Sequence, residues 1–208
     1  NWGGQGQNGY GVLFTGRNQS GGNRWAMVSD VTFEWNEVRN SSNGINLMGQ
    51  DDENPSAISK RLKIAHNLVT GIGAQPGIDV GIAFLVSNGY EDINIDHNTT
   101  LNSGASMILA GLPSPRLRMT NNIVQHNRYG IKGDGTNSGN PSITKFLPGS
   151  VITKNVLATP VEAGWEPYYP PGNYLPMTLA EVGFLSYPTN LKLAASSPYH
   201  NAATDGSD

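Results

Sequence analysis

Short stretches of alternating apolar and polar residues recur along the chain, and each ends at an asparagine. The clearest copies are VTFEWN, LKIAHN, INIDHN and LRMTNN, a weaker one is SVITKN, and they close at Asn36, Asn67, Asn98, Asn122 and Asn155. These asparagines are 31, 31, 24 and 33 residues apart. The alternation predicts a strand with one buried face, and the recurrence predicts a stacked repeat.

Two further strand-like stretches fit within each period. A valine follows several of the asparagines, as at Val38 and Val69, and an apolar run comes later, as at residues 45–48 and 107–109. The copies are too far apart for simple hairpins, and no helical pattern fills the gaps. Three short strands per turn, stacked turn on turn, predict an all-β fold of the parallel β-helix (solenoid) type.

The asparagine column has a physical rationale. A sharp turn between two strands needs a residue that tolerates positive φ, and asparagine is one of the few that do. Stacking places equivalent residues roughly 4.8 Å apart, so their amide side chains can hydrogen-bond along the stack. Asparagine is also common in turns generally. Five matches in one register favour an Asn ladder.

Several stretches resemble a known family. VTFEWNEVRN, RLKIAHNLVTG and LRMTNNIVQHNRYGIKG resemble coils of bacterial right-handed parallel β-helix proteins of the pectate-lyase-like superfamily. The opening NWGGQGQNGYGVLFTGRNQ and the closing SSPYHNAATDG are similar to segments of uncharacterised secreted members. The resemblance implies a right-handed β-helix, a polysaccharide partner and an extracellular or periplasmic location. The fold hosts lyases, hydrolases, epimerases and non-catalytic stalks, so the resemblance does not choose a reaction.

The length of 208 residues predicts one domain. Residues 1–155 read as about five to six coils with upstream coils missing, and residues 156–208, rich in Pro and aromatics, as an irregular C-terminal cover. Thr178 and Glu181 have the spacing of a capping box, which predicts a short helix. An uncovered N-terminal coil would expose a sheet edge, so we expect a monomer or an edge-associated oligomer.

Composition excludes several classes of function. A net charge of −3 gives no reason to expect nucleic acid. The chain has no cysteine, so it has neither disulfides nor thiol chemistry. No apolar run approaches the roughly 18 residues of a membrane span.

In the resembled superfamily, substrate lies along the first strand of each coil, which here corresponds to residues 44–48, 81–86, 106–110 and 130–132. Alternation puts Asn46, Ser106 and Lys132 on the outer face of these strands. Aromatic rings at Trp165 and Tyr168 could stack on sugars, although such rings more often fill loop contacts. The polar residues expected on the rims of this groove are Asp51, Asp52, Asp134, Arg39, Asn102, His126 and Arg128.

Two chemistries fit these residues. Glycoside hydrolysis needs two carboxyl groups roughly 5–9.5 Å apart, but Asp51 and Asp52 are three coils, roughly 14 Å, from Asp134. Elimination from a uronic acid needs a base and a cation for the carboxylate. We therefore expect any catalytic group to be His126, Arg128, Lys132 and Asp134, with Asp51 and Asp52 as the alternative. The simpler interpretation of both sets is exposed polar side chains.

No cofactor is firmly expected. The acidic residues 51–53 suit Ca²⁺ but lack EF-hand spacing. His66 and His97 occupy equivalent positions in adjacent coils and could share a metal or merely stack. The sequence therefore predicts a carbohydrate-active protein that cleaves or modifies a polysaccharide, lyase-like or glycoside-hydrolase-like. The alternative is a non-catalytic polysaccharide-binding or adhesive stalk.

Overall fold

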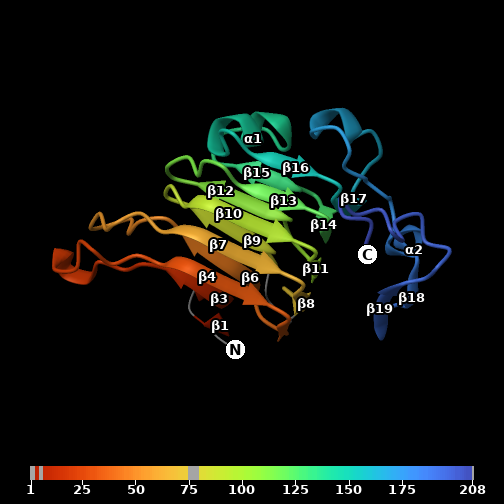
Figure 1. Cartoon of the computed structure of the whole chain (residues 1–208), viewed down its shortest axis with the longest axis horizontal. Helices are drawn as coiled ribbons and strands as arrows, with labels where there is room; N and C mark the ends of the chain where they lie inside the picture. Colours follow the sequence, from red (N-terminus) through yellow and green to blue (C-terminus); the bar gives the residue numbers. More distant parts are fainter. Residues whose placement is uncertain (1–2, 5–6, 75–79, 208) are drawn as a thin grey trace.

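The computed structural model describes residues 3–4, 7–74 and 80–207. The fold is mostly β and contains three parallel five-stranded sheets (Figure 1). Sheet I contains β3 (Tyr10–Thr15), β6 (Asn43–Met48), β9 (Phe84–Ser87), β12 (Met107–Ala110) and β15 (Ile131–Gly133). Sheet II contains β4 (Ser29–Glu34), β7 (Lys60–Ala65), β10 (Glu91–Asp96), β13 (Arg118–Thr120) and β16 (Val151–Thr153). Sheet III contains β5 (Glu37–Arg39), β8 (Leu68–Ile72), β11 (Thr99–Asn102), β14 (Ile123–Asn127) and β17 (Val156–Pro160).

The chain passes through sheets I, II and III in turn, so each coil supplies one strand to each sheet. This order is consistent with a parallel β-helix and confirms the expected three strands per coil. The predicted alternation is also confirmed, because Phe33, Ile64, Ile95, Met119 and Ile152 pair in register on sheet II. The last four of these side chains are buried in the core between the sheets.

The Asn ladder is present and is longer than predicted. The Oδ1 atom of Asn98 accepts from the backbone N–H and the Nδ2 of Asn67, at 3.0 and 2.9 Å. The same pair of bonds links Asn36 to Asn67 and each later member to the next. The ladder ends at Asn173, whose Oδ1 accepts from Asn155 and which the strand pattern does not reveal.

The expected φ of the ladder residues was wrong. The positive φ of this turn falls one residue earlier, at the residues Trp35 (61°), His66 (53°), His97 (50°), Asn121 (61°) and Lys154 (59°). Asparagine is needed at the next position for its amide, which bonds two coils at once, and not for its backbone tolerance.

A charged column runs along the corner between sheets I and II. Arg61 pairs with Asp30 through Nε and Nη2, both at 2.6 Å, and Arg116 pairs with Asp92 at 2.6 and 3.0 Å. All four residues have positive φ, so acid and base alternate from coil to coil at one strained turn. The hydrogen bond from Arg61 lowers the pKa of Asp30, and that from Arg116 lowers the pKa of Asp92.

Both ends of the chain add elements outside the three sheets. Helix α1 (Asn140–Phe146), which the sequence pattern does not predict, lies beside the last coil (Figure 1). It buries Ile143 and Phe146 in the core. Sheet III continues past the expected boundary at residue 155, because β17 pairs with β14. The remaining elements are β1 (Gly3–Gly4), β2 (Gln7–Asn8), η1 (Gln19–Gly21), η2 (Glu166–Tyr168), α2 (Leu179–Val182), β18 (Phe184–Ser186) and β19 (Asn190–Leu193).

The capping box is confirmed at the start of α2. The Thr178 side chain accepts from the backbone N–H of Glu181, whose carboxylate in turn accepts from the N–H of Met177. Within the described residues, none of the helices combines the length and apolar character that a membrane span requires.

Candidate functional site

The turn between β14 and β15 positions two of the predicted site residues. Gly130 lies in this turn with φ of 54°, and a Cβ atom there would lie 2.0 Å from the Tyr169 hydroxyl and 2.3 Å from His126 Nε2. Only glycine therefore allows the chain to pass this close to the two rings. The turn carries Arg128 before it and Lys132 after it.

His126 lies inside the stack and not on the rim where the sequence placed it. Its side chain is fully buried, because Val124 and His126 both lie on the inward face of β14. Nε2 accepts from the Tyr169 hydroxyl at 2.8 Å, and Nδ1 donates to the carbonyl of Asn127 at 2.7 Å. The Tyr169 oxygen also accepts from the N–H of Ile131 at 3.1 Å. The direction of the bond between Tyr169 and His126 follows from the ring tautomer, because a neutral imidazole that carries its proton on Nδ1 can only accept at Nε2. Burial lowers the pKa of His126, so the ring is neutral and both of its nitrogens are occupied.

A cavity of about 680 Å³ brings together four of the predicted residues, Arg128, Lys132, Trp165 and Tyr168. It lies between the β14–β15 turn, the segment before α1 and the chain that returns after β17. This volume is typical of small-molecule sites in proteins. We call it the Arg128 cavity. The other residues that line it are Tyr129, Asn137, Ser138, Val161, Glu162, Ala163 and Gly164.

Aromatic rings form much of the wall of the Arg128 cavity. The Trp165 ring packs on His126 at a centroid distance of 4.8 Å and on Tyr168 at 5.6 Å. Its Nε1 is buried and has no hydrogen-bond partner among the described residues. The rings of Tyr129 and Tyr168 are about half exposed.

The charge of the Arg128 cavity is positive. Arg128 and Lys132 are its two cations, and Glu162 is the one carboxylate among its lining residues. The Arg128 guanidinium lies 5.5 Å from the centre of the Tyr129 ring, and Lys132 Nζ donates to the carbonyl of Thr136. This combination of cations and exposed rings suits an anionic ligand that also has an apolar face.

The predicted acidic residues lie elsewhere. Asp134 is exposed and does not line the Arg128 cavity; its backbone carbonyl accepts from Lys145. Asp51 is 3% exposed, and its carboxylate accepts from the backbone N–H groups of Asn54, Glu53 and Asn18. The bonds from Asn54 and Glu53 lower the pKa of Asp51.

Arg17 ties this acidic loop to the loop of the preceding coil. Its Nε lies 3.2 Å from Asp51, and its Nη1 donates to Asp52 at 2.7 Å. The carboxylates of residues 51 and 52 therefore join two loops together. Across the parts of the chain that the structure describes, no three His, Asp or Glu side chains are grouped as a metal site would require.

The remaining predicted substrate residues are spread over two sheets. Asn46 faces outward from sheet I in register with Leu85, but Ser106 is buried and its hydroxyl donates to the carbonyl of Gln125. The prediction that Ser106 faces a groove was therefore wrong. Arg39 and Asn102 line a separate cavity on the outer face of sheet III.

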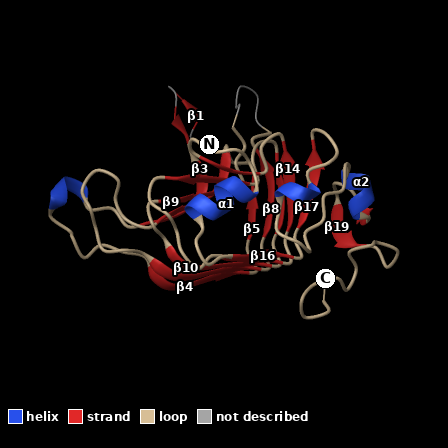
Figure 2. Ribbon diagram, turned by 90° about the horizontal axis from the view of Figure 1, so that it is seen from above, coloured by secondary structure: helices blue, strands red, loops and turns tan. Residues whose placement is uncertain are grey.

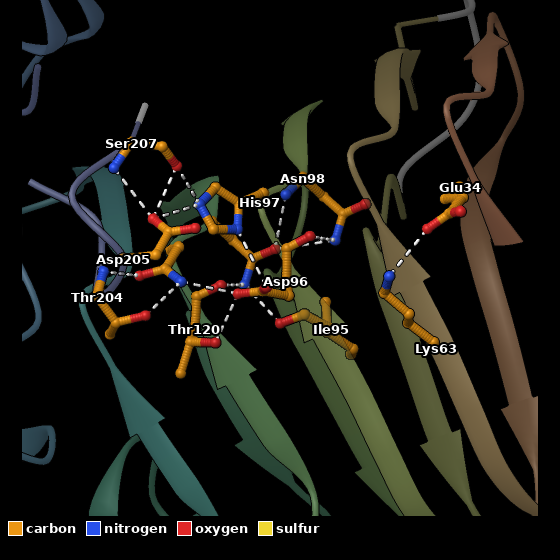
Figure 3. Close-up of polar contacts among 12 residues, drawn as sticks. Glu34, Lys63, Ile95, Asp96, His97, Asn98, Thr120, Thr204, Asp205 and Ser207 are labelled. Atoms are coloured by element: carbon orange, nitrogen blue, oxygen red, sulfur yellow. Dashed lines mark hydrogen bonds and ion pairs between the residues drawn. The ribbon is translucent and has the colours of Figure 1, made fainter. Parts of the chain in front are cut away.

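The two histidines stack, as one of the two interpretations expected. The ring of His66 lies between Trp35, at a centroid distance of 4.3 Å, and His97, at 5.0 Å. The C-terminal segment contacts His97, because Nε2 lies 3.0 Å from the Ser207 hydroxyl (Figure 3). On the other side of the ring, Nδ1 lies 3.0 Å from Asp96 of β10.

Asp96 anchors this tail contact on sheet II. Its carboxylate accepts from Thr120 at 2.6 Å and from Asn121 at 2.8 Å, and Asn121 also bonds Thr204 of the tail (Figure 3). Burial alone would raise the pKa of Asp96, but the bonds from Thr120, His97 and Asn121 together lower it. His97 is thus part of a tail-docking network.

No family model, no curated protein and no solved structure matches the chain.

Proposed function

We propose that the protein is a right-handed parallel β-helix protein of the pectate-lyase-like kind that binds an acidic polysaccharide in the Arg128 cavity. The observation that carries the proposal is the placement of Arg128 and Lys132 beside exposed aromatic rings in one cavity of sugar-binding size. The order of strands through sheets I, II and III supports the β-helix assignment. An acidic polysaccharide partner fits an extracellular or periplasmic location.

The chemistry of the ligand follows from the lining. A uronic acid ring has an apolar face that stacks on an aromatic ring and a carboxylate that pairs with a cation. Arg128 can hold a carboxylate with two parallel bonds, while Lys132 supplies a point charge.

Binding without catalysis is better supported than hydrolysis. A glycosidase needs two carboxyl groups across the scissile bond, and the Arg128 cavity has one, at Glu162. His126 is buried behind Trp165 with both nitrogens bonded, so it is a positioning residue for the turn and not a base.

Elimination is the second candidate, because Lys132 lies beside Arg128 in the same cavity. In this reaction Lys132 would take the proton from C5 of the uronic acid as the C4–O bond breaks, and the departing glycosidic oxygen would take up a proton from water. The products would be a C4–C5 double bond and a new reducing end. Arg128 would neutralise the carboxylate that makes the C5 proton acidic.

The test is calorimetric titration with hexamers of galacturonate, mannuronate and glucuronate, followed by analysis for unsaturated products. We expect Arg128→Gln to weaken binding of at least one hexamer by about ten-fold or more. This is the loss of affinity expected when a charge-assisted hydrogen bond between Arg128 and the sugar carboxylate is removed. Arg118→Gln is the matched control, since Arg118 is exposed on sheet II, away from the cavity. Equal affinities in the two variants would sink the proposal. Unsaturated products that disappear in Lys132→Gln would establish the elimination.

A further inference from the structure

A second groove includes the cavity on the outer face of sheet III that Arg39 and Asn102 line. The hairpin of β18 and β19 lies beside the outer face of sheet III (Figure 2) and leaves a cavity of about 700 Å³ against it. Sheet III contributes Thr70, Leu101 and Gln125 to this cavity, and the hairpin contributes Tyr187 and Thr189.

This cavity continues around the corner toward sheet II. A neighbouring cavity of about 420 Å³ is lined by Trp35, His66 and His97, and the two share the lining residues Leu68, Thr189 and Leu191. Together they form one groove, which we call the hairpin groove.

The lining of the hairpin groove differs in charge from that of the Arg128 cavity. Arg39 is already paired with Glu37, so the sheet side presents mainly hydroxyl, amide and apolar groups. Asn102 is 2% exposed, lines the groove, and has an Oδ1 without a partner among the described residues.

Trp35 gives the groove a stacking platform at one end. One face of its indole lies on His66, with 5° between the ring planes, yet the residue is 74% exposed. The other face of the indole is therefore open. Tyr187, 52% exposed, supplies a ring on the hairpin side.

We propose that the hairpin groove is a second binding site, for a neutral oligosaccharide. Sugar rings have apolar faces for Trp35 and Tyr187 and hydroxyl edges for Thr70 and Gln125. A peptide is less well matched, because the backbone of β8 and β11 is already paired on both sides and cannot accept another strand. The inference is independent of the Arg128 cavity, which selects charge.

The experiment is a nuclear magnetic resonance titration of the full chain with cellohexaose, mannohexaose, xylohexaose and maltohexaose. At least one of these hexamers should shift the indole N–H signal of Trp35 in a saturable manner. That signal is assigned by its absence in Trp35→Asn, a change that removes the ring and suits the φ of 61° at this position. Trp35→Asn should weaken binding by about three- to ten-fold.

Thr189→Trp provides a second variant, on the hairpin, that fills the junction of the two cavities and changes no residue of the coils. It should abolish binding, whereas Leu185→Trp on the same hairpin, at a residue that lines neither cavity, should leave it unchanged. Arg128→Gln should have no effect, which separates this site from the acidic one. Failure of all four hexamers to shift Trp35, or equal binding by the two tryptophan variants, would overturn the inference.

Discussion

Replacing Asn98 by alanine removes the centre of the Asn ladder. The Asn98 side chain is 1% exposed and makes five hydrogen bonds. Its Oδ1 accepts twice from Asn67, and its Nδ2 donates to the carbonyls of Ile64 and Asp96 and to Asn122 Oδ1. Alanine would leave the backbone N–H of Asn67 buried without an acceptor.

The expected cost follows from these bonds. Each intramolecular hydrogen bond contributes about 0.5–1.5 kcal/mol, and a buried orphaned donor costs about 1–3 kcal/mol. Two neighbouring groups keep a partner in the variant: Asn67 Nδ2 still donates to the carbonyl of Phe33, and Asn122 Oδ1 still accepts from the backbone N–H of residue 98. We therefore expect Asn98→Ala to lower the free energy of unfolding by about 2–5 kcal/mol in total. Asn36→Ala is the matched control at the end of the ladder. Asn36→Ala removes two hydrogen bonds at a half-buried site, so we expect it to lower the free energy of unfolding by about 1–2 kcal/mol.

Urea unfolding of both variants measures these costs, and hydrogen exchange locates them. With a slope of about 1–3 kcal/mol per molar urea, a cost of about 2–5 kcal/mol should lower the midpoint of Asn98→Ala by at least about 0.7 M. The amide of Asn67 should lose its protection against exchange in Asn98→Ala and keep it in Asn36→Ala. Equal midpoints for the two variants, or a protected Asn67 amide in Asn98→Ala, would refute the reasoning.

Three further predictions concern the turn, the buried histidine and the exposed edge. Gly130→Ala should lower the free energy of unfolding by about 2–4 kcal/mol, because the new Cβ atom meets Tyr169 and His126. Gly164 also has a positive φ but has open space around it, so Gly164→Ala should lower the free energy of unfolding by about 1 kcal/mol in the same urea assay. The lowered pKa of His126 means that the unfolded chain binds more protons than the folded one. Stability should therefore fall as pH drops below about 6.5, and His126→Gln should flatten that limb of a pH series of urea midpoints. If the open edge at β3 associates, light scattering should show a mass that rises with concentration and that falls in Leu13→Lys; a constant mass would contradict this.

The regular part of the fold was predictable because it is periodic. Period-two alternation identified the inward positions at Phe33, Ile64 and Ile95, and the asparagine register identified the ladder from Asn36 to Asn155. Asn173 was missed because it extends the ladder from an irregular segment, with no alternating strand before it. Helix α1 was missed because it begins after Gly139, with no side-chain cap.

The site was harder to predict because it depends on non-local returns of the chain. Arg128 and Lys132 follow from the turn that joins two strands, but Trp165 and Tyr168 reach them only because the chain folds back after β17. His126 could have been placed correctly, since alternation from the apolar Val124 puts it on the inward face of β14. The burial of Asp51 could not be predicted, because its carboxylate contacts Arg17 and Asn18, which belong to the loop of another coil.

The most direct test of the central claim compares each uronic hexamer with its carboxyl-reduced counterpart, which keeps the ring and loses the charge. For the hexamer that binds best, we expect carboxyl reduction to weaken binding to the unsubstituted protein by about ten-fold or more. The same reduction should have little effect on Arg128→Gln, because the carboxylate then lacks its bidentate partner. Equal affinity of the natural sequence for the acidic and the reduced hexamers would contradict the claim that Arg128 and Lys132 form an acidic-saccharide site.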